Sequence, residues 1–278
     1  MKKERNNHKR RRSMVVPVLS CIAIALVGLI VFMLLNISEK EEVIVEPTVE
    51  STTMAAATTD VTTEVTTETT TEPEETKPPM LENMAELYEE NSDVIGWVRI
   101  ADTKLDYPVM FTPEDEEKYI RTSFDGKFSI AGVPFIDKDC SLDPRSDNII
   151  IYGHNMYNGT AFHTLLKYDQ KTFWEKHPTF TFSTLYEEKE YEIVSCFYDR
   201  VYLTTESAFR FYRFVDAEDE EDFDHAIEQF KKKGLYDTGV TAEYGDNLVT
   251  LVTCAYHVDN GRFVVVGREI TEDTRRAT

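Results

Sequence analysis

The pattern of apolar and polar positions divides the chain into three unlike stretches. Residues 14–37, "MVVPVLSCIAIALVGLIVFMLLNI", are apolar and contain no ionisable carboxylate or amine. Residues 38–79 are rich in Thr, Glu and Pro and nearly lack large apolar side chains, so they cannot bury a core. From Met80 to Thr278, short alternating or periodic apolar runs return, as expected of a folded domain.

The apolar stretch 14–37 has the length and the flanks of a membrane-spanning helix. It exceeds the ~20 residues that cross a hydrocarbon core, whereas the core of a cleaved signal peptide has about 7–15. The basic residues 1–13 precede it, and Lys and Arg stay on the cytoplasmic side. We therefore predict a cytoplasmic tail (1–13), a signal anchor in the cell membrane (14–37), an extracellular disordered stalk (38–79) and an extracellular domain (80–278). A buried core helix is the alternative for the apolar stretch.

Helical periodicity is clearest in residues 216–234. There, apolar side chains recur on one stripe formed by Phe223, Ala226, Ile227 and Phe230. Acidic first turns, a lysine-rich last turn and a glycine directly after it suit the helix dipole and the C-cap. Weaker helical patterns cover residues 80–90, 114–124 and 161–178.

Alternating and β-branched runs predict strands between these helices. They cover residues 96–100, 132–137, 147–155, 179–184, 189–202, 247–254 and 262–270. Many short strands with a few helices between them indicate one mainly β domain, either a barrel or a sandwich with helical insertions.

Charge and cysteine content narrow the class of protein. The net charge is −21, and the only cluster of Lys and Arg is the N-terminal tail, which argues against a nucleic-acid partner. Of the four cysteines, Cys21 falls in the predicted anchor. Three thiols remain outside, and an odd number leaves at least one unpaired or bonded between chains. We expect Cys140 and Cys196 to pack in or near the core, with a disulfide between them as an alternative.

The final predicted hairpin, 247–270, carries two groups that a hairpin does not need. If its strands pair antiparallel, Cys254 and Arg262 flank the connecting loop and lie at one edge of the sheet. Nearby positive charge favours the reactive thiolate, and a guanidinium offers fixed donors to a developing oxyanion. The structural alternatives are a small buried side chain for Cys254 and a surface charge for Arg262.

A thiol nucleophile generally needs a histidine within hydrogen-bonding reach. His257 follows Cys254 closely but lies in the loop, whereas His154 ends the apolar strand 147–155. A strand end holds a catalytic group more rigidly than a loop does, so spacing favours His154 without excluding His257. We interpret the other histidines as cytoplasmic, solvated or packing residues: His8, His163, His177 and His225.

Two segments resemble the signature motifs of sortases, the cysteine transpeptidases of Gram-positive cell surfaces. These are "IIIYGHNM" with "GTAFHTLLKY", and "TLVTCAY" with "NGRFVVVGRE". The resemblance runs from Met80 to the C-terminus and is strongest to class B, whose members carry N-terminal helices and a long helix before the cysteine strand. It implies a closed β-barrel of about eight strands. It maps the catalytic residues to His154, Cys254 and Arg262, and leaves His257 without a role.

The resemblance also implies an activity and its partners. Cys254 would attack the threonine carbonyl of a sorting signal near the C-terminus of an exported protein. The acyl-enzyme would pass to an amine of a peptidoglycan precursor or to a pilin lysine, with no metal or organic cofactor. Thr253 is expected to line the cleft and Asn155 to support the histidine turn. The signal, the acceptor and the choice among housekeeping, haem-uptake and pilus roles stay open.

Other functions remain as alternatives. An L,D-transpeptidase typically places its cysteine just after a His-Gly pair, which "LVTCAY" lacks, and another cell-wall cysteine peptidase is also conceivable. A stalked, non-enzymatic receptor or adhesin would need no nucleophile. His154, Cys254 and His257 could also supply three ligands to zinc, although no paired Cys-x-x-Cys or His-x-x-x-His spacing fixes that geometry.

Overall fold

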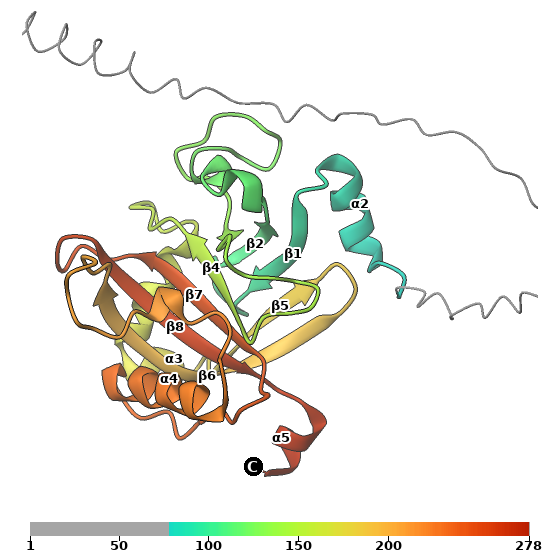
Figure 1. The fold of residues 1–278 in the computed structure, drawn as a ribbon. Coiled ribbons are helices and arrows are strands. Elements are labelled where there is room, and N and C mark those ends of the chain that lie inside the picture. The colour runs from blue at the N-terminus through green and yellow to red at the C-terminus, as the bar shows by residue number, and fades with distance from the viewer. Residues whose placement is uncertain (1–77, 278) are drawn as a thin grey trace, which may run out of the picture. The chain divides into compact units, whose positions relative to one another are not determined.

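The computed structural model describes residues 78–277, and the strands of this part close into a barrel (Figure 1). Their order around the barrel is β1-β2-β3-β4-β7-β8-β6-β5. The bounds are β1 Val94–Arg99, β2 Asp106–Met110, β3 Phe135–Ile136, β4 Asn148–Gly153, β5 Thr179–Thr184, β6 Glu188–Arg200, β7 Leu248–Cys254 and β8 Gly261–Glu269. The predicted mainly β barrel is confirmed, and the sandwich alternative is excluded.

Helices and 3₁₀ turns lie before, between and after these strands. They are α2 Glu82–Glu90, η1 Pro113–Asp115, η2 Lys118–Ile120, η3 Phe162–Asp169, α3 Lys171–Trp174, η4 Phe211–Arg213, α4 Glu220–Lys233 and α5 Glu272–Ala277. None of the described helices is both long and apolar enough to cross a bilayer. The predicted tail (1–13), the predicted anchor (14–37) and nearly all of the predicted stalk lie outside the described residues.

One local prediction was wrong, and one strand was missed. The single helix expected over residues 114–124 is replaced by the short turns η1 and η2, because only Tyr119 of these turns is buried and no apolar stripe exists to pack a helix. Strand β2 was not predicted, because Pro108 interrupts its sequence signal and cannot donate to a ladder. The barrel accommodates this proline, since β2 pairs with β3 only at Met110↔Phe135 and leaves most of that edge unpaired.

Parallel pairing of β4 with β7 sets the frame for the rest of the domain. The two strands run in register from Asn148↔Leu248 to Gly153↔Thr253. Both are nearly continuous apolar runs, as expected of parallel strands covered on both faces. Because they point the same way, their C-terminal ends reach the same rim of the barrel. Strand β8 begins at that rim, since it returns antiparallel from β7.

Helix α4 packs on β6 (Figure 1). Its predicted apolar stripe is confirmed, because Phe223, Ala226, Ile227 and Phe230 are all buried. The Asp219 side chain accepts a hydrogen bond from the Asp222 backbone N–H at 3.0 Å, which caps the first turn. Gly234 ends the helix for a different reason from the one expected. Its φ is −53°, outside the left-handed region, and a Cβ there would lie 2.9 Å from Ser195 Oγ.

Candidate active site

Cys254 and Arg262 are directly opposite each other in the ladder between β7 and β8. Paired residues of antiparallel strands place their side chains on the same face, with Cβ atoms about 4.5–5.5 Å apart. Both residues are half-buried, so each side chain retains access to solvent. The hairpin therefore presents a thiol and a guanidinium together at one rim of the barrel.

The end of β4 brings a histidine to the same rim. Gly153↔Thr253 is the last pair of the β4–β7 ladder, so His154 leaves its strand at the level where Cys254 ends β7. Thr253 Oγ1 donates a hydrogen bond to the Gly153 carbonyl at 2.8 Å and joins the two strand ends. A Cβ on Gly153 would approach Phe162 Cγ within 2.5 Å, so only glycine lets that buried ring close against the strand.

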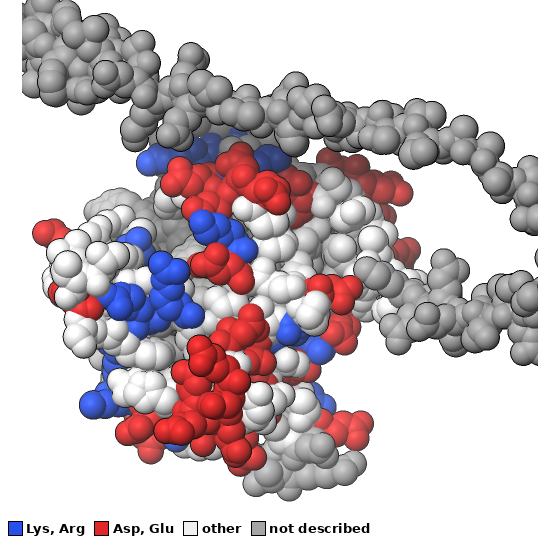
Figure 2. Space-filling model, viewed as in Figure 1, with Lys and Arg blue, Asp and Glu red and all other residues white. Residues whose placement is uncertain are grey.

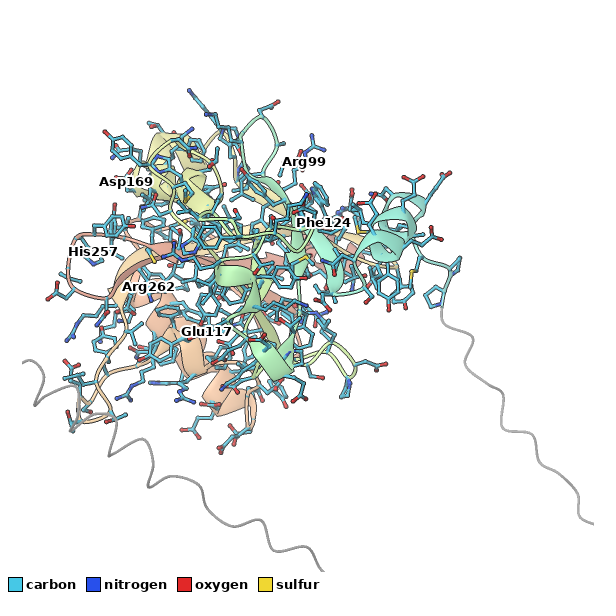
Figure 3. All side chains as sticks on the ribbon, turned by 90° about the horizontal axis from the view of Figure 1, so that it is seen from above. Arg99, Glu117, Phe124, Asp169, His257 and Arg262 are labelled. Carbon is cyan, nitrogen blue, oxygen red and sulfur yellow. The ribbon has the colours of Figure 1, made fainter. Side chains whose placement is uncertain are left out.

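A cavity of about 220 Å³ lies at this rim. Its lining contains all three catalytic residues that the resemblance implied, together with the expected Thr253: Ile120, Phe135, Tyr152, Gly153, His154, Val252, Thr253, Cys254 and Arg262. His257 is not among them. It is exposed, and its ring lies 4.8 Å from the ring of Tyr198, although it shares with Arg262 one end of the domain (Figure 3).

One hydrogen bond fixes the His154 ring. Its Nε2 lies 2.9 Å from the backbone carbonyl of Ile120. Because a carbonyl oxygen can only accept, Nε2 carries the proton of this bond, and Nδ1 is the acceptor in the neutral ring. Nδ1 is therefore the ring nitrogen that can gain and lose a proton while this anchor stays in place. The turn η2, which sequence reasoning had placed in a longer helix, supplies the anchor.

A second link joins the histidine turn to the cysteine. Asn155 Nδ2 donates a hydrogen bond to the Cys254 carbonyl at 2.9 Å, and Asn155 Oδ1 lies 2.7 Å from His163 Nδ1. His163, interpreted from sequence as a packing or surface residue, thus holds the Asn155 amide in one orientation. The sequence signal that could have indicated this contact is the short loop after His154, where the chain folds back and Asn155 pairs with Ala161.

The Arg262 guanidinium keeps its charge available at the cavity. Its Nη1 donates to the backbone carbonyls of Asn260 at 3.2 Å and Gly261 at 3.0 Å. Within the described part of the chain, no carboxylate lies within ion-pair distance of Arg262. Burial raises the pKa of the neighbouring Tyr152 hydroxyl, as does Asp137, while the charge of Arg262 acts in the opposite direction. Arg262 and Tyr152 both line the cavity.

The other two cysteines of the domain differ from Cys254 in their surroundings. Cys140 and Cys196 are buried, unpaired thiols, so the predicted core positions are confirmed and the disulfide alternative is not realised. Burial raises the pKa of each thiol to about 12. Of the three described thiols, only Cys254 combines partial exposure with a neighbouring histidine and arginine. Residues 78–277 contain no group of three or more His, Cys, Asp or Glu side chains that could hold a metal ion.

Comparison with known proteins connects this geometry to a family. A family model described as a sortase domain matches residues 98–270. Sortase B of Listeria monocytogenes is 31% identical over 196 residues, which cover 69% of this chain and 75% of that protein. Sortase B of Staphylococcus aureus is 27% identical over 194 residues, with the same 69% and 75% coverage.

Solved structures agree with the sequence relatives. A Staphylococcus aureus sortase B–substrate complex superposes with a TM-score of 0.61 at 26% identity, covering 70% of this chain and 87% of that one. A crystal structure of Staphylococcus aureus sortase B at 2.0 Å gives a TM-score of 0.62 at 27% identity, with 69% and 89% coverage.

Proposed function

Because this chain belongs to the sortase family and is a class B cysteine transpeptidase, we propose that its catalytic residues are Cys254, His154 and Arg262. The observation that carries the assignment is their presence around one cavity, with Cys254 on β7, Arg262 on β8 and His154 directly after β4. Its substrate would be an exported protein that ends in a sorting signal.

The first half-reaction forms a thioester. The Cys254 thiolate attacks the carbonyl carbon of the substrate threonine, and a tetrahedral oxyanion develops beside the donors of Arg262. As the C–N bond breaks, Nδ1 of protonated His154 gives its proton to the departing amine. The N-terminal part of the substrate stays bonded to Cys254 as a thioacyl-enzyme, and His154 becomes neutral.

The second half-reaction transfers the acyl group. An acceptor amine attacks the thioester carbon and loses a proton to His154, and the Cys254 thiolate leaves. The products are a new amide and an enzyme with its original protonation. A peptidoglycan-precursor amine and a pilin lysine both satisfy this chemistry, and no metal or organic cofactor is needed for either step.

The substrate class is supported by a relative. The Staphylococcus aureus enzyme of similar fold has been solved as a sortase B–substrate complex. The apolar cavity lining around a single thiol, with Ile120, Phe135 and Val252, suits an extended peptide segment more than a charged small molecule. We therefore propose a sorting-signal peptide as the acyl donor.

We also propose a cellular location for the enzyme. Residues 14–37 would anchor the enzyme in the cell membrane, with residues 1–13 in the cytoplasm and 38–79 lifting the catalytic domain from the outer surface. This arrangement would bring exported substrates and wall precursors to the enzyme.

A trapping experiment tests the proposed chemistry. The full-length chain is incubated with a library of sorting-signal peptides, without and with an amine acceptor, and is digested for mass spectrometry. We expect a peptide-derived thioester on Cys254, its discharge by the amine, and no cleavage by Cys254→Ala. Cleavage by that variant, or an acyl group on another residue, would end the assignment of the nucleophile.

A further inference from the structure

A row of three side chains crosses β7, β8 and β6 at the level of the cavity. Cys254 is paired with Arg262 between β7 and β8, and Arg262 is paired with Asp199 between β8 and β6. Paired residues share a face of the sheet, so the register places the Asp199 carboxylate next to the Arg262 guanidinium on the side away from the thiol. No sequence pattern had indicated Asp199.

An aspartate in this position would be expected to bind the arginine. Asp199 is 5% exposed, and a carboxylate removed from water needs charged or hydrogen-bonding partners. An arginine fork matches a carboxylate well and commonly binds it through two parallel hydrogen bonds. Such a pair would hold Arg262 over β6 and take it away from Cys254.

In the structure, the Asp199 carboxylate contacts other groups and not Arg262. Lys233 Nζ, in the last turn of α4, lies 3.0 Å from Asp199 Oδ2. Tyr202 donates its hydroxyl to Asp199 Oδ1 at 2.7 Å, and the Arg200 backbone N–H donates to the same oxygen at 2.9 Å. Oδ1 thus accepts two hydrogen bonds, and Oδ2 is paired with the Lys233 ammonium although it accepts no hydrogen bond. Arg262 bonds instead to the carbonyls of its own turn.

Lys233 is itself held in place from two sides. Its Nζ lies 3.4 Å from Tyr202 Oη as well as beside Asp199. Burial opposes the ammonium charge, but hydrogen bonding and attraction from Asp199 outweigh it, so the pKa of Lys233 is raised. The ammonium of Lys233 is therefore favoured beside the Asp199 carboxylate.

We propose that Lys233 is a positioning residue for Arg262: by occupying Asp199, it leaves the guanidinium directed at the Cys254 cavity. The inference rests on the proposed role of Arg262 and extends it, because it assigns a task in the reaction to the last turn of the helix that precedes the cysteine strand. Without Lys233, Asp199 would capture Arg262, and the developing oxyanion would lose its donor.

The test compares four forms of the full-length chain: wild type, Lys233→Met, Asp199→Asn and the double variant. Lys233→Met should lower kcat/KM at least about tenfold, short of the ~10²- to 10³-fold loss on removing an oxyanion donor outright. Asp199→Asn should stay within about threefold of wild type, and the double variant should recover to that level, because no carboxylate remains to capture Arg262. The control is Lys232→Met, which removes an exposed lysine of the same turn.

A second readout is independent of any peptide substrate. Arg262 beside Cys254 favours alkylation by the anion iodoacetate relative to neutral iodoacetamide. The ratio of the two rates should fall in Lys233→Met to nearly the value of Arg262→Ala, and should return in the double variant. The double variant and the wild type carry the same net charge, so this comparison removes the general effect of losing a cation.

Three outcomes would overturn the inference. The first is an unchanged alkylation ratio and full activity in folded Lys233→Met. The second is a loss in Lys233→Met that the double variant does not restore, which would indicate a merely structural lysine. The third, which holds even if Lys233→Met fails to fold, is a loss of activity in Asp199→Asn. An inactive wild type with a normal alkylation pattern would count against the proposed function rather than against the role of Lys233.

Discussion

Asn155 donates a hydrogen bond from its side-chain amide to the backbone carbonyl of Cys254, with a donor–acceptor distance of 2.9 Å. The β4–β7 ladder has ended one residue earlier, at Gly153↔Thr253. This side chain therefore continues the connection between the two strands at the point where the backbone no longer makes it. His154 and Cys254, far apart in sequence, are held in a fixed relation by the residue that follows the histidine.

Replacing Asn155 by alanine should impair catalysis more than folding. The lost hydrogen bond contributes ~1 kcal/mol, and its loss frees the turn that carries His154, so we expect kcat to fall about fivefold to tenfold. KM for the peptide and the melting temperature should change little. The control is Tyr157→Ala, which removes a fully exposed side chain two residues further along the same loop. Equal losses in the two variants would contradict a specific role for Asn155.

Gly153→Ala should destabilise the end of β4, directly before His154. The new Cβ would lie 2.5 Å from Phe162 Cγ, and that ring is fully buried. Overpacking of this kind costs about 1–3 kcal/mol, which urea unfolding can measure. Adding Phe162→Leu should recover part of the loss by making room for the methyl group. If Gly153→Ala alone has the same urea midpoint of unfolding as the wild type, the close approach of Phe162 to Gly153 does not constrain the strand.

The three thiols of the domain should react very differently with iodoacetamide at pH 8. Cys254 is half-exposed, whereas burial raises the pKa of Cys140 and Cys196 to about 12 and leaves almost no thiolate on them. Among these three, peptide mass spectrometry of the folded protein should therefore find the label on Cys254 alone, and on all three after unfolding in urea. Labelling of Cys140 or Cys196 in the folded state at a rate similar to that of Cys254 would contradict the described core.

Acid should remove one identifiable contribution to stability. Hydrogen bonding from Lys118 lowers the pKa of Asp93, Tyr119 adds to this effect, and burial opposes it. A carboxylate with a lowered folded-state pKa stabilises the fold above its unfolded pKa of ~3.9, and that stability is lost as the pH falls through the folded value.

Asp93→Asn should therefore lower the free energy of unfolding by at most ~1 kcal/mol at pH 7, because Lys118 is 41% exposed and solvent screens the pair. The difference between variant and wild type should shrink as the pH falls below ~4 and should also shrink in 1 M salt. A difference that grows in acid would contradict the lowered pKa.

Much of this fold could be predicted from local patterns. The buried strand 148–153, the terminal hairpin and the amphipathic helix α4 each bury a face whose period is visible in the sequence. Strand β2 and the turns η1 and η2 could not be predicted, since Pro108 and a charged run hide them. Their conformation depends on contacts with distant parts of the chain, such as the hydrogen bond from Tyr119 to Asp93 at 2.8 Å.

The candidate site could likewise be predicted only in part from the sequence. Cys254 and Arg262 could be placed together from the hairpin alone, because antiparallel pairing follows from a short loop. Spacing favoured His154 only weakly, and the decision came from resemblance. The supporting residues Ile120, Asp199 and Lys233 gave no local signal. They come close to the site only after the barrel closes and α4 packs on β6. The surface also carries many similar acidic side chains, so the sequence does not single out one functional charge (Figure 2).

The central claim is that the histidine directly after β4, and not the one nearest to the cysteine in sequence, serves the thiol. Its most direct test is kcat/KM for sorting-signal cleavage by His154→Ala beside His257→Ala. We expect His154→Ala to lose activity by at least about 10²-fold, as for a general acid–base residue, and His257→Ala to keep most of it. Retained activity in His154→Ala, with loss in His257→Ala, would contradict the account.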